Sequence, residues 1–376
     1  MRVTFLLSIF FLSLSPSTSA QQNIFFNPGG QRLSFGKDKA KTAALETGDI
    51  DGDGDIDVVI ANGRHWPDQN EIFLNSGDGS FTVSYQIGKF KSTTYANLLG
   101  DLDGDGDLDI VEGNDDAPNR IYLNDGQGNF TASGTFGQAY APTRNLHLCD
   151  IDNDGDLDVL ITNRGSKNEI CLNDGNGNFP RSVFFGKEDD STIDVKTFDI
   201  DNDGDLDLVL ANRDAQENYI YYNNNLDFSI GKPVSRDTLD SRAVALADFN
   251  KDGFPDLLIG NIGAPNQICF NDKRGGFENC TAIDTIADFT FSLDIGDINQ
   301  DGLLDIVVGN SGQQNYYYLA RKDNSGFDRF AINDNEFDTY RILLQDLNGD
   351  KFPEILEANS DEFNLYFINV IPYRRK

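Results

Sequence analysis

Residues Asp101 to Asp109 read D-L-D-G-D-G-D-L-D, and variants of this acidic loop recur seven times along a chain of 376 residues. The loops begin at Asp49, Asp101, Asp150, Asp199, Asp248, Asp297 and Asp346. The first interval between them is 52 residues, and the other five are 49 residues. Self-similarity at a fixed period of this length indicates a protein built from structural repeats.

Each loop carries oxygen-bearing side chains at positions 1, 3, 5 and 9. In loop one, Gly54 at position 6 permits the sharp turn that lets these ligands converge, and Asp55 at position 7 is expected to offer its backbone carbonyl. Calcium takes six to eight oxygen ligands, whereas magnesium retains more water and zinc prefers His and Cys, which these loops lack. The pattern therefore predicts structural calcium sites, and the alternative is a set of acidic turns without metal.

The predicted metal ligands differ among the loops. Loops one to four have aspartate at every odd position: Asp49, Asp51, Asp53, Asp55, Asp57, Asp101, Asp103, Asp105, Asp107, Asp109, Asp150, Asp152, Asp154, Asp156, Asp158, Asp199, Asp201, Asp203, Asp205 and Asp207. Loops five and six provide Asp248, Asn250, Asp252, Asp256, Asp297, Asn299, Asp301 and Asp305. Loop seven has Asn348 at position 3, Lys351 in place of glycine and Glu354 at position 9. A nearby cation and a non-glycine turn both weaken binding, so we expect about five to seven calcium ions, with loop seven the weakest site.

The first 20 residues have the features of a secretory signal peptide. Arg2 supplies the positive charge, residues 3–14 form the apolar core, and residues 18–20 form a small-residue cleavage site. The apolar stretch is too short to span a membrane, and no other segment of the sequence is suited to do so. We therefore expect one mature domain, residues 21–376, in a secreted, periplasmic or extracellular location, without membrane insertion.

The formal net charge of the chain is −32, and 29 of its 62 acidic residues occupy odd positions of the seven loops. Seven divalent ions would reduce the net charge to −18. A surface that remains negative argues against nucleic acid and anionic membranes as partners.

The four cysteines suit an oxidising compartment. Cys269 and Cys280 flank one predicted hairpin, where they are placed to face each other and form a disulfide. Cys149 and Cys171 lie in one repeat, on strands that we do not expect to be adjacent, and we expect buried thiols there.

Each repeat contains four strand signals. One run leads into the acidic loop, as in residues 43–47, and an apolar run leaves it, as in residues 57–60. An aromatic-rich run bounded by Asn follows, as in residues 119–124, and a Gly-rich turn precedes a weaker fourth strand. Four-stranded units of this length are typical of propeller blades. The sequence predicts an all-β protein, a seven-bladed β-propeller of four-stranded blades.

The two ends of the chain indicate how the ring closes. The last repeat stops after its third strand, residues 364–369, and the missing fourth strand appears at residues 32–36. A blade built from both termini would close the ring and remove open sheet edges. Residues 23–27 resemble an additional third strand, and the sequence does not indicate its place.

These motifs resemble those of the FG-GAP/VCBS repeat family, which includes the N-terminal propeller of integrin α subunits. The resemblance rests on D-x-D-G-D-G-D-x-D followed by four apolar residues, then G/A-N, then N-x-I-Y-L-N-D-G-x-G-x-F, and it extends from Asn23 to Asn369. It implies a calcium-binding propeller with seven blades. Members include adhesion receptors, fungal lectins and propellers attached to lyases or phospholipases, so the resemblance leaves the function open.

The three extra residues of the first interval lie between the second and third strands of the first repeat, on the face opposite the acidic loops. This insertion reads G-R-H-W-P-D-Q and contains Arg64, His65 and Trp66, the only tryptophan of the chain. A tryptophan beside polar groups can stack on a sugar or anchor a protein contact. These three residues are the predicted ligand-binding site, and the alternative is that Trp66 folds back to cover its blade.

A hydroxyl residue stands seven positions before each acidic loop: Thr42, Thr94, Thr143, Thr192, Ser241, Thr290 and Thr339. We expect these residues, together with Tyr95, Arg144, Arg242 and Tyr340, near the central axis. They predict either a polar funnel with basic and aromatic groups or hydroxyls that satisfy backbone groups where strands begin.

We expect a monomeric, non-enzymatic propeller that binds a glycan or an extracellular protein. The sequence contains no G-x-S-x-G, no H-E-x-x-H and no phosphate-binding glycine loop. The alternative is a polysaccharide lyase that uses the central funnel, with Lys196, His147 and Asp294 at equivalent inner-strand positions.

Overall fold

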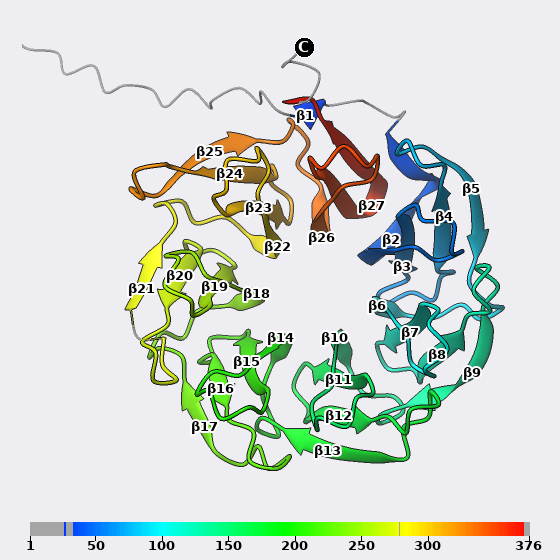
Figure 1. Cartoon of the computed structure of the whole chain (residues 1–376), viewed down its shortest axis with the longest axis horizontal. Coiled ribbons are helices and arrows are strands. Elements are labelled where there is room, and N and C mark those ends of the chain that lie inside the picture. The colour runs from blue at the N-terminus through cyan, green and yellow to red at the C-terminus, as the bar shows by residue number, and fades with distance from the viewer. Residues whose placement is uncertain (1–25, 28–32, 278, 372–376) are drawn as a thin grey trace, which may run out of the picture.

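The computed structural model describes residues 26–27, 33–277 and 279–371. The predicted signal peptide, residues 1–20, lies outside these ranges. The elements of the described chain are strands, and they form repeated four-stranded sheets around a central axis, as in a β-propeller (Figure 1). Within the described ranges, no helix has the length and hydrophobicity needed to cross a membrane.

Five sheets contain four consecutive antiparallel strands each. Their strands are β6 (Thr94–Gly100), β7 (Asp109–Asn114), β8 (Asn119–Leu123) and β9 (Thr131–Phe136); β10 (Thr143–Cys149), β11 (Asp158–Asn163), β12 (Asn168–Leu172) and β13 (Arg181–Phe185); β14 (Thr192–Phe198), β15 (Asp207–Asn212), β16 (Tyr219–Tyr221) and β17 (Gly231–Pro233); β18 (Ser241–Ala247), β19 (Asp256–Asn261), β20 (Gln267–Phe270) and β21 (Asn279–Ala282); β22 (Thr290–Gly296), β23 (Asp305–Asn310), β24 (Tyr316–Ala320) and β25 (Phe327–Ala331). In each sheet the first strand lies nearest the axis and the fourth lies at the rim (Figure 1).

The remaining strands form one seven-stranded sheet that combines both ends of the described chain. They are β1 (Phe26–Asn27), β2 (Ser34–Gly48), β3 (Asp57–Asn62), β4 (Glu71–Asn75), β5 (Phe81–Gln86), β26 (Asp338–Gln345) and β27 (Glu354–Asn369). Ser34 pairs with Leu365 and Phe35 with Asn364, so the start of β2 lies beside the last strand of the chain. Further along, β2 pairs with β3.

Strand β1 pairs with the same part of β27, with Phe26 opposite Asn369. Strand β1 and the start of β2 therefore lie along one edge of β27. The interpretation of residues 23–27 as an additional third strand is wrong for residues 26–27, and residues 23–25 lie outside the described ranges. The aromatic pattern has a packing origin, because the rings of Phe26 and Tyr317 lie 5.3 Å apart.

The second strand of each sheet is buried along its whole length, and all six residues of β7 and all six of β11 are inaccessible. A strand that is covered on both faces reads as a continuous apolar run and not as an alternating one. By contrast, five of the six residues of β9, at the rim, are exposed. The second strands are therefore more apolar in sequence than the fourth strands because they are buried and the fourth strands face solvent.

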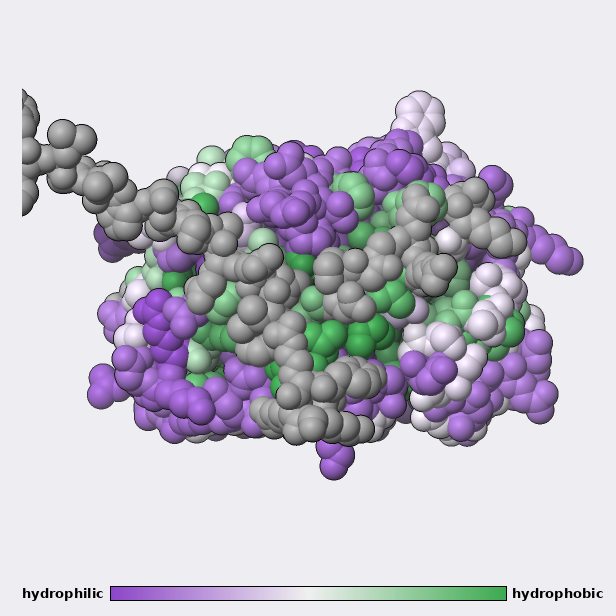
Figure 2. Space-filling model, turned by 90° about the horizontal axis from the view of Figure 1, so that it is seen from above, coloured by the Kyte–Doolittle hydropathy of each residue, from purple (hydrophilic) through white to green (hydrophobic). Residues whose placement is uncertain are grey.

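Hydrophobic cores lie between neighbouring sheets. One cluster joins Val111 of β7 to Val159 of β11, and another joins Val58 of β3 to Leu356 of β27. In an edge-on view, hydrophobic residues form a band between two hydrophilic faces (Figure 2). Each sheet therefore needs neighbours on both sides to bury its apolar surface.

The cysteines take the two states that the sequence predicts. Cys269 and Cys280 form a disulfide and pair directly across the β20–β21 hairpin. Cys149 on β10 and Cys171 on β12 are free and buried, and β11 separates them. Burial raises the pKa of both thiols, so they stay protonated and unreactive at neutral pH.

Candidate functional site

The acidic loops connect the first strand of each sheet to the second, and they share one backbone turn. The amide of position 6 donates to the carboxylate of position 1, as from Gly54 N to Asp49 Oδ2 at 3.1 Å. The φ angle at position 6 is positive, +95° at Gly54, and glycine adopts this conformation without strain. Loop seven makes the same turn with Lys351 at a φ of 74°. Because lysine has a Cβ atom, this left-handed conformation strains the backbone of loop seven.

Side-chain oxygens converge in loops one to four. In each of these loops, one oxygen from each of three aspartates lies within 4.8 Å of the other two. The groups are Asp49, Asp51 and Asp53; Asp101, Asp103 and Asp109; Asp150, Asp152 and Asp158; and Asp199, Asp201 and Asp203. This convergence brings together the position 1, 3 and 5 or 9 side chains that the sequence predicts as ligands.

The convergent oxygens are suited to a hard cation. Oδ1 of Asp51, of Asp103 and of Asp152 is buried and has no hydrogen-bond partner among the described residues. Burial, together with the neighbouring carboxylates, raises the pKa of all three groups. Crowded carboxylate oxygens without donors fit calcium, which binds through oxygen alone and would relieve the repulsion among them.

The carboxylate at position 9 also holds the sheet together. Asp57 accepts hydrogen bonds from Ile50 N at 2.9 Å and from Asn75 N at 2.8 Å, which ties loop one to the third strand of its sheet. Equivalent bonds occur in the other six loops. Burial raises the pKa of Asp57 to about 6 and that of Asp158 to about 7.

The Gly-rich turn of each early repeat is shaped by position 7 of the acidic loop. A Cβ atom on Gly77 would lie 2.6 Å from Asp55 Oδ2, and one on Gly126 would lie 2.5 Å from Asp107 Oδ2. Such contacts would displace the aspartate side chain, and the φ angles of +80° at Gly77 and +71° at Gly126 favour glycine there. The acidic loop and the Gly-rich turn are thus one structural unit.

Loops five and six each meet a lysine that the sequence reasoning missed. Lys273 Nζ lies 3.2 Å from Asp252 Oδ2, and Lys322 Nζ lies 3.9 Å from Asp301 Oδ2. Both lysines come from the turn between the third and fourth strands, where repeat one reads S-G-D-G and repeats two and three read D-G-x-G, so the lysines could have been noticed in the sequence. Within the described ranges, loops five to seven form no group of three convergent carboxylates. An ammonium group at this place reduces the attraction for a metal ion.

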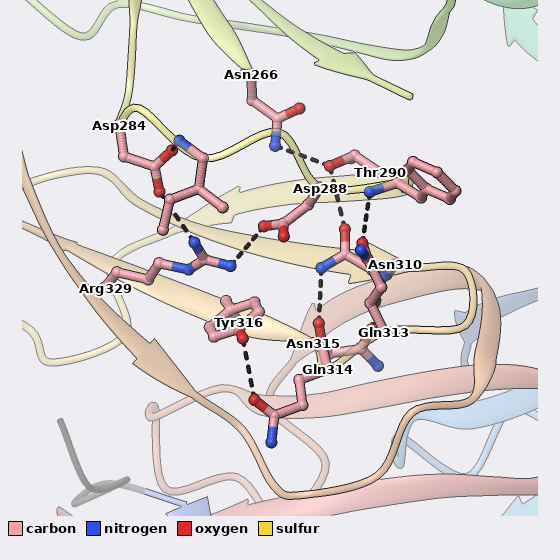
Figure 3. Close-up of polar contacts among 12 residues, drawn as sticks. Asn266, Asp284, Asp288, Thr290, Asn310, Gln313, Gln314, Asn315, Tyr316 and Arg329 are labelled. Carbon is pink, nitrogen blue, oxygen red and sulfur yellow. Dashed lines mark hydrogen bonds and ion pairs between the residues drawn. The ribbon is translucent and has the colours of Figure 1, made fainter. Parts of the chain in front are cut away.

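The seven hydroxyl residues do not line a funnel, because all of them are fully buried. Thr290 Oγ1 donates to Asn310 Oδ1 in its own sheet at 3.1 Å and accepts from Asn266 Nδ2 of the preceding sheet at 2.9 Å (Figure 3). Similar pairs involve Thr42, Thr94, Ser241 and Thr339. The expectation of backbone partners is wrong, because Asn offers both a donor and an acceptor in one side chain. The hydroxyls form a girdle that joins neighbouring sheets.

A β-bulge follows the hydroxyl in every inner strand. In β6, Thr94 pairs with Asn114 and Ala96 with Gly113, which leaves Tyr95 as the extra residue. The equivalent residues of the seven inner strands are Ala43, Tyr95, Arg144, Ile193, Arg242, Phe291 and Tyr340. All seven line one central cavity of about 50 Å³, and we call this set of seven residues the mouth. Because a bulge re-aims a side chain, it delivers one residue per strand to the cavity.

The insertion of the first repeat reaches the mouth. The Arg64 guanidinium lies 4.3 Å from the centre of the Tyr340 ring. His65 Nε2 is 2.9 Å from the Tyr95 hydroxyl, and His65 Nδ1 is 2.8 Å from Asp115 Oδ2. The structure therefore brings two of the predicted ligand-binding residues together with the predicted basic and aromatic groups.

Trp66, the third predicted residue of the insertion, is 68% exposed. The alternative in which its indole covers the blade is therefore wrong. Arg64 adopts a left-handed φ of 47°, and Trp66 N donates to Gly63 O at 2.7 Å. This tight turn directs Arg64 inward and leaves the indole in solvent.

The arginines of the mouth differ in their partners. Arg144 forms an ion pair with Asp115 at 2.5 Å. Arg242 lies 4.0 Å from the ring centre of Phe291 and 5.0 Å from that of Tyr340, and it forms no ion pair with any residue that the structure describes. Burial lowers the pKa of Arg242 to about 10, so it remains charged at neutral pH.

The residues that a lyase would use are engaged in packing. His147 is close to Thr197 Oγ1, at 3.0 Å, and burial together with the charge of Lys196 lowers its pKa to about 3. Lys196 Nζ lies 3.5 Å from Asp194. Asp294 accepts hydrogen bonds from two backbone amides, and burial raises its pKa. Each of these side chains therefore bonds to other groups of the inner strands.

Solved structures of other proteins share this fold at low sequence identity. The BBS1N chain from a complex with ARL6DN matches with a TM-score of 0.62 and 10% identity, over 93% of this chain and 98% of that one. Sqt1 of Saccharomyces cerevisiae matches with a TM-score of 0.59 and 10% identity, over 89% of this chain and 98% of that one. No curated protein matches the sequence.

The FG-GAP-like repeat matches six times in succession, at residues 49–112, 101–161, 150–210, 199–259, 248–308 and 297–357. Each match starts at the first aspartate of one acidic loop and extends past the next loop. Together the matches cover most of the chain, and the protein belongs to the FG-GAP-like repeat family.

Proposed function

We propose that this chain is a secreted, calcium-stabilised propeller that acts as a non-enzymatic binding module. Its ligand is a glycan or an extracellular protein, and the arrangement of exposed side chains favours a protein. The single observation that carries the proposal is the grouping of exposed apolar residues on the loops that surround the mouth.

The architecture in this proposal has seven blades in a closed ring. Five blades are the four-stranded sheets, and the seven-stranded sheet supplies two more that share β2. The first half of β2 completes the last blade beside β27, and the second half begins the first blade beside β3. The bond from Asn364 Nδ2 to Thr42 Oγ1, at 3.0 Å, supports this closure, because it repeats the girdle between the last blade and the first.

Calcium would be held by the acidic loops and would supply charge neutralisation and rigidity, not catalysis. Loops one to four carry convergent oxygens, some of them partner-free in loops one to three, and are the proposed high-affinity sites. Loops five to seven, each with a lysine at or beside the loop, are proposed to bind more weakly. The residues that would act as ligands also support the mouth indirectly, because each loop ends the inner strand that carries a mouth residue.

The exposed face that favours a protein ligand is the one opposite the acidic loops. The loops on this face carry the following large exposed apolar side chains: Trp66, Phe90, Tyr140, Ile286 and Phe289. Aromatic and aliphatic residues that stay exposed around a polar centre are typical of protein-binding surfaces. The similarity to BBS1N, which was crystallised in complex with ARL6DN, agrees with a protein-binding role for this architecture.

The polysaccharide lyase alternative gains little support from the site. A general base must be accessible and have a pKa near the working pH, whereas burial lowers the pKa of His147 to about 3. Incubation with a panel of polyuronides tests this alternative directly. Absorbance from an unsaturated product would establish the lyase activity and contradict the non-enzymatic proposal.

The test of the binding proposal uses Trp66→Ala and a matched control, Val83→Ala. Val83 is 52% exposed but lies on the outer strand β5, away from the mouth. Both variants and the wild type are applied, with calcium, to an array of extracellular protein domains and to a glycan array. We expect Trp66→Ala to weaken the wild-type interaction by roughly thirtyfold, the value of about 2 kcal/mol for an anchoring aromatic residue.

Three results separate the possibilities. Loss of binding in Trp66→Ala, with Val83→Ala unchanged and both melting temperatures near wild type, supports the proposed face. Equal binding by both variants contradicts it. Retention of glycans in place of proteins changes the ligand class and leaves the binding module in place.

A further inference from the structure

Arg242 is a partly buried cation that forms no ion pair with any residue in the described ranges. Its guanidinium has five N–H donors. Its Nε atom is buried without a partner, and the contacts of the group within the described residues are the aromatic rings of Phe291 and Tyr340. Moving an unpaired charge out of water raises the free energy, and cation–π contacts with aromatic rings offset only part of this increase.

The positive charges near Arg242 favour the binding of an anion beside it. Arg64 also stacks on the Tyr340 ring, 4.3 Å from its centre, and it forms no ion pair with a described residue. The charge of Arg213 is close enough to contribute to the lowered pKa of Arg242. The nearby carboxylate of Asp115 is already engaged by Arg144 and by the insertion. The guanidinium groups of Arg242 and Arg64 therefore stack on one aromatic ring at the mouth, and neither forms an ion pair with a described residue.

A second group below the mouth is also without partners. Asn97 on β6 is 1% exposed, and neither its Oδ1 nor its Nδ2 atom has a hydrogen-bond partner among the described residues. Asn97 lines the same cavity as Arg242. A buried amide and a partly buried guanidinium that line one small cavity, neither with a polar partner among the described residues, form a donor set for a ligand oxygen.

Arg329 shows how this chain treats an arginine that serves packing alone. Its guanidinium lies 3.5 Å from the Tyr316 ring centre, a stacking contact like that of Arg242. Unlike Arg242, it is held by Asp288 Oδ2 at 2.5 Å and by Asp284 Oδ2 at 3.4 Å (Figure 3). The stacked but unpaired state of Arg242 is therefore not required by the stacking itself.

We propose that the mouth is a receptor for one carboxylate group, presented by an acidic side chain of a partner protein, with Arg242 as its main donor and Arg64 as a flanking charge. This inference rests on the proposed binding function and adds the chemistry of the group that is recognised. A planar guanidinium fork matches a carboxylate, and it binds more tightly where water is excluded.

Size and charge favour a single carboxylate on a protein over an acidic polysaccharide. The cavity of about 50 Å³ admits one small group and not a sugar ring. The net charge of −32 repels a polyanion at long range, whereas it opposes one carboxylate only weakly. The exposed apolar side chains around the mouth suit the peptide that would carry this carboxylate.

The probe is the blocked tripeptide acetyl-Gly-Glu-Gly-amide, and its neutral match is acetyl-Gly-Gln-Gly-amide. Binding to the full-length protein with calcium is followed by ligand-observed NMR at constant ionic strength. We expect the Glu peptide to bind and the Gln peptide not to bind. Arg242→Met should weaken the Glu peptide by about tenfold or more, the value of one hydrogen-bonded charge pair.

Arg329→Met is the matched control, because it removes a stacked arginine from another place. It should leave peptide binding unchanged and lower the melting temperature, since Asp288 and Asp284 lose their partner. Arg242→Met should keep or raise the melting temperature without peptide, because it removes an unpaired charge. Arg242→Lys, which keeps the charge and loses the fork, should also weaken binding and serves if the Met variant fails to fold.

Two results would overturn the proposal: no binding of the Glu peptide, or binding that survives both substitutions of Arg242. Galacturonate is the third probe, and its binding in place of the Glu peptide would overturn the protein source of the carboxylate. The Trp66→Ala variant should retain the Glu peptide, because the indole lies outside the cavity. Failure of the partner-binding test at Trp66 is thus distinguishable from failure of the carboxylate site.

Discussion

Lys351 occupies a backbone conformation that the other six acidic loops assign to glycine. Its φ is 74°, and its amide makes the same bond to Asp346 Oδ2, at 2.8 Å, that glycine makes elsewhere. Lys351→Gly should therefore raise the free energy of unfolding by about 1 kcal/mol, the cost of a left-handed residue with a Cβ atom. Urea denaturation in EDTA measures this without the effect of metal.

Gly155→Ala is the reverse change in loop three. A Cβ atom there would meet nothing within 4 Å, so only the backbone conformation is altered. We expect it to lower the free energy of unfolding by about 1 kcal/mol. If neither substitution changes stability, strain at position 6 is not a property that distinguishes loop seven.

Glu357 is a buried acid whose titration should be visible in stability. It is inaccessible and accepts a hydrogen bond from Asn315 Nδ2 at 2.7 Å, and burial raises its pKa from 4.5 to about 7. Between these values the folded state holds a proton that the unfolded chain has released, so this group lowers stability as the pH rises through that window. Glu357→Gln should become more stable than wild type by an amount on the order of 1–3 kcal/mol between pH 5 and pH 8.

The measurement compares unfolding in urea at both pH values, and the comparison with wild type cancels the other titrating groups. Glu188→Gln is the control, because the Glu188 side chain is 82% exposed. A stability difference between Glu357→Gln and wild type that does not change with pH would contradict the buried titration.

At the scale of the strand, the asparagine that ends the third strand of five repeats donates a hydrogen bond to a neighbouring acidic loop. Asn173 Nδ2 donates to Leu102 O of the preceding acidic loop at 2.9 Å and to Leu157 O at 3.1 Å. Asn173→Ala should lower the free energy of unfolding by about 2 kcal/mol or more, because buried carbonyls lose their donor. Calorimetry against Asn178→Ala provides the comparison.

Asn178 belongs to the same turn but is exposed and bonds only to groups within that turn. Its replacement should change stability by less than about 0.5 kcal/mol. Equal losses at the two positions would mean that the bond between sheets contributes nothing beyond the local turn.

The strands, the acidic loops and the Cys269–Cys280 pair could be predicted because each depends on residues close together in sequence. The bulges could not be predicted, because a register shift depends on how two strands pair. It does not change the alternation of apolar and polar residues in a strand of seven residues. For the same reason Ile193 and Phe291 were missed as mouth residues, although Arg144 and Arg242 attracted notice by their charge. The exposure of Trp66 depended on one left-handed residue, Arg64, that composition does not reveal.

At the scale of the whole molecule, the proposed calcium ions should be a condition of stability. Chelation should lower the melting temperature by more than about ten degrees, since several sites at about 1.4 kcal/mol each, at ten times the dissociation constant, approach the stability of a domain. Calorimetry with calcium and with EDTA is the measurement. An unchanged transition would refute the structural role of the metal.

The matched comparison within this prediction is Asp103→Ala against Asn348→Ala, both at position 3 of their loops. Asp103 belongs to a convergent group of carboxylates, whereas Asn348 donates to Glu354 Oε1 at 3.1 Å beside a lysine-bearing turn. In calcium, Asp103→Ala should lose more stability, and in EDTA the difference should disappear. Equal losses in calcium would mean that loop seven is occupied as fully as loop two.

The sharing of one sheet by both ends of the chain was predictable from a count of strands, because the last repeat lacked one and the start supplied it. The two-part edge of β27, formed by β1 and the start of β2, was not predictable. The pairing of these two segments with β27 joins residues that are far apart in the sequence, which a local apolar pattern does not indicate.

The bulge in every inner strand also has a consequence for engineering. The bulged residue faces the cavity and takes no part in strand pairing. The neighbouring residues pair the strands, and the hydroxyl residue before it belongs to the girdle. A combinatorial library that varies only residues 43, 95, 144, 193, 242, 291 and 340 would therefore resemble the hypervariable loops of an antibody, but mounted on paired strands. Seven independent choices on a constant scaffold offer new specificities without a change in the parts that hold the ring.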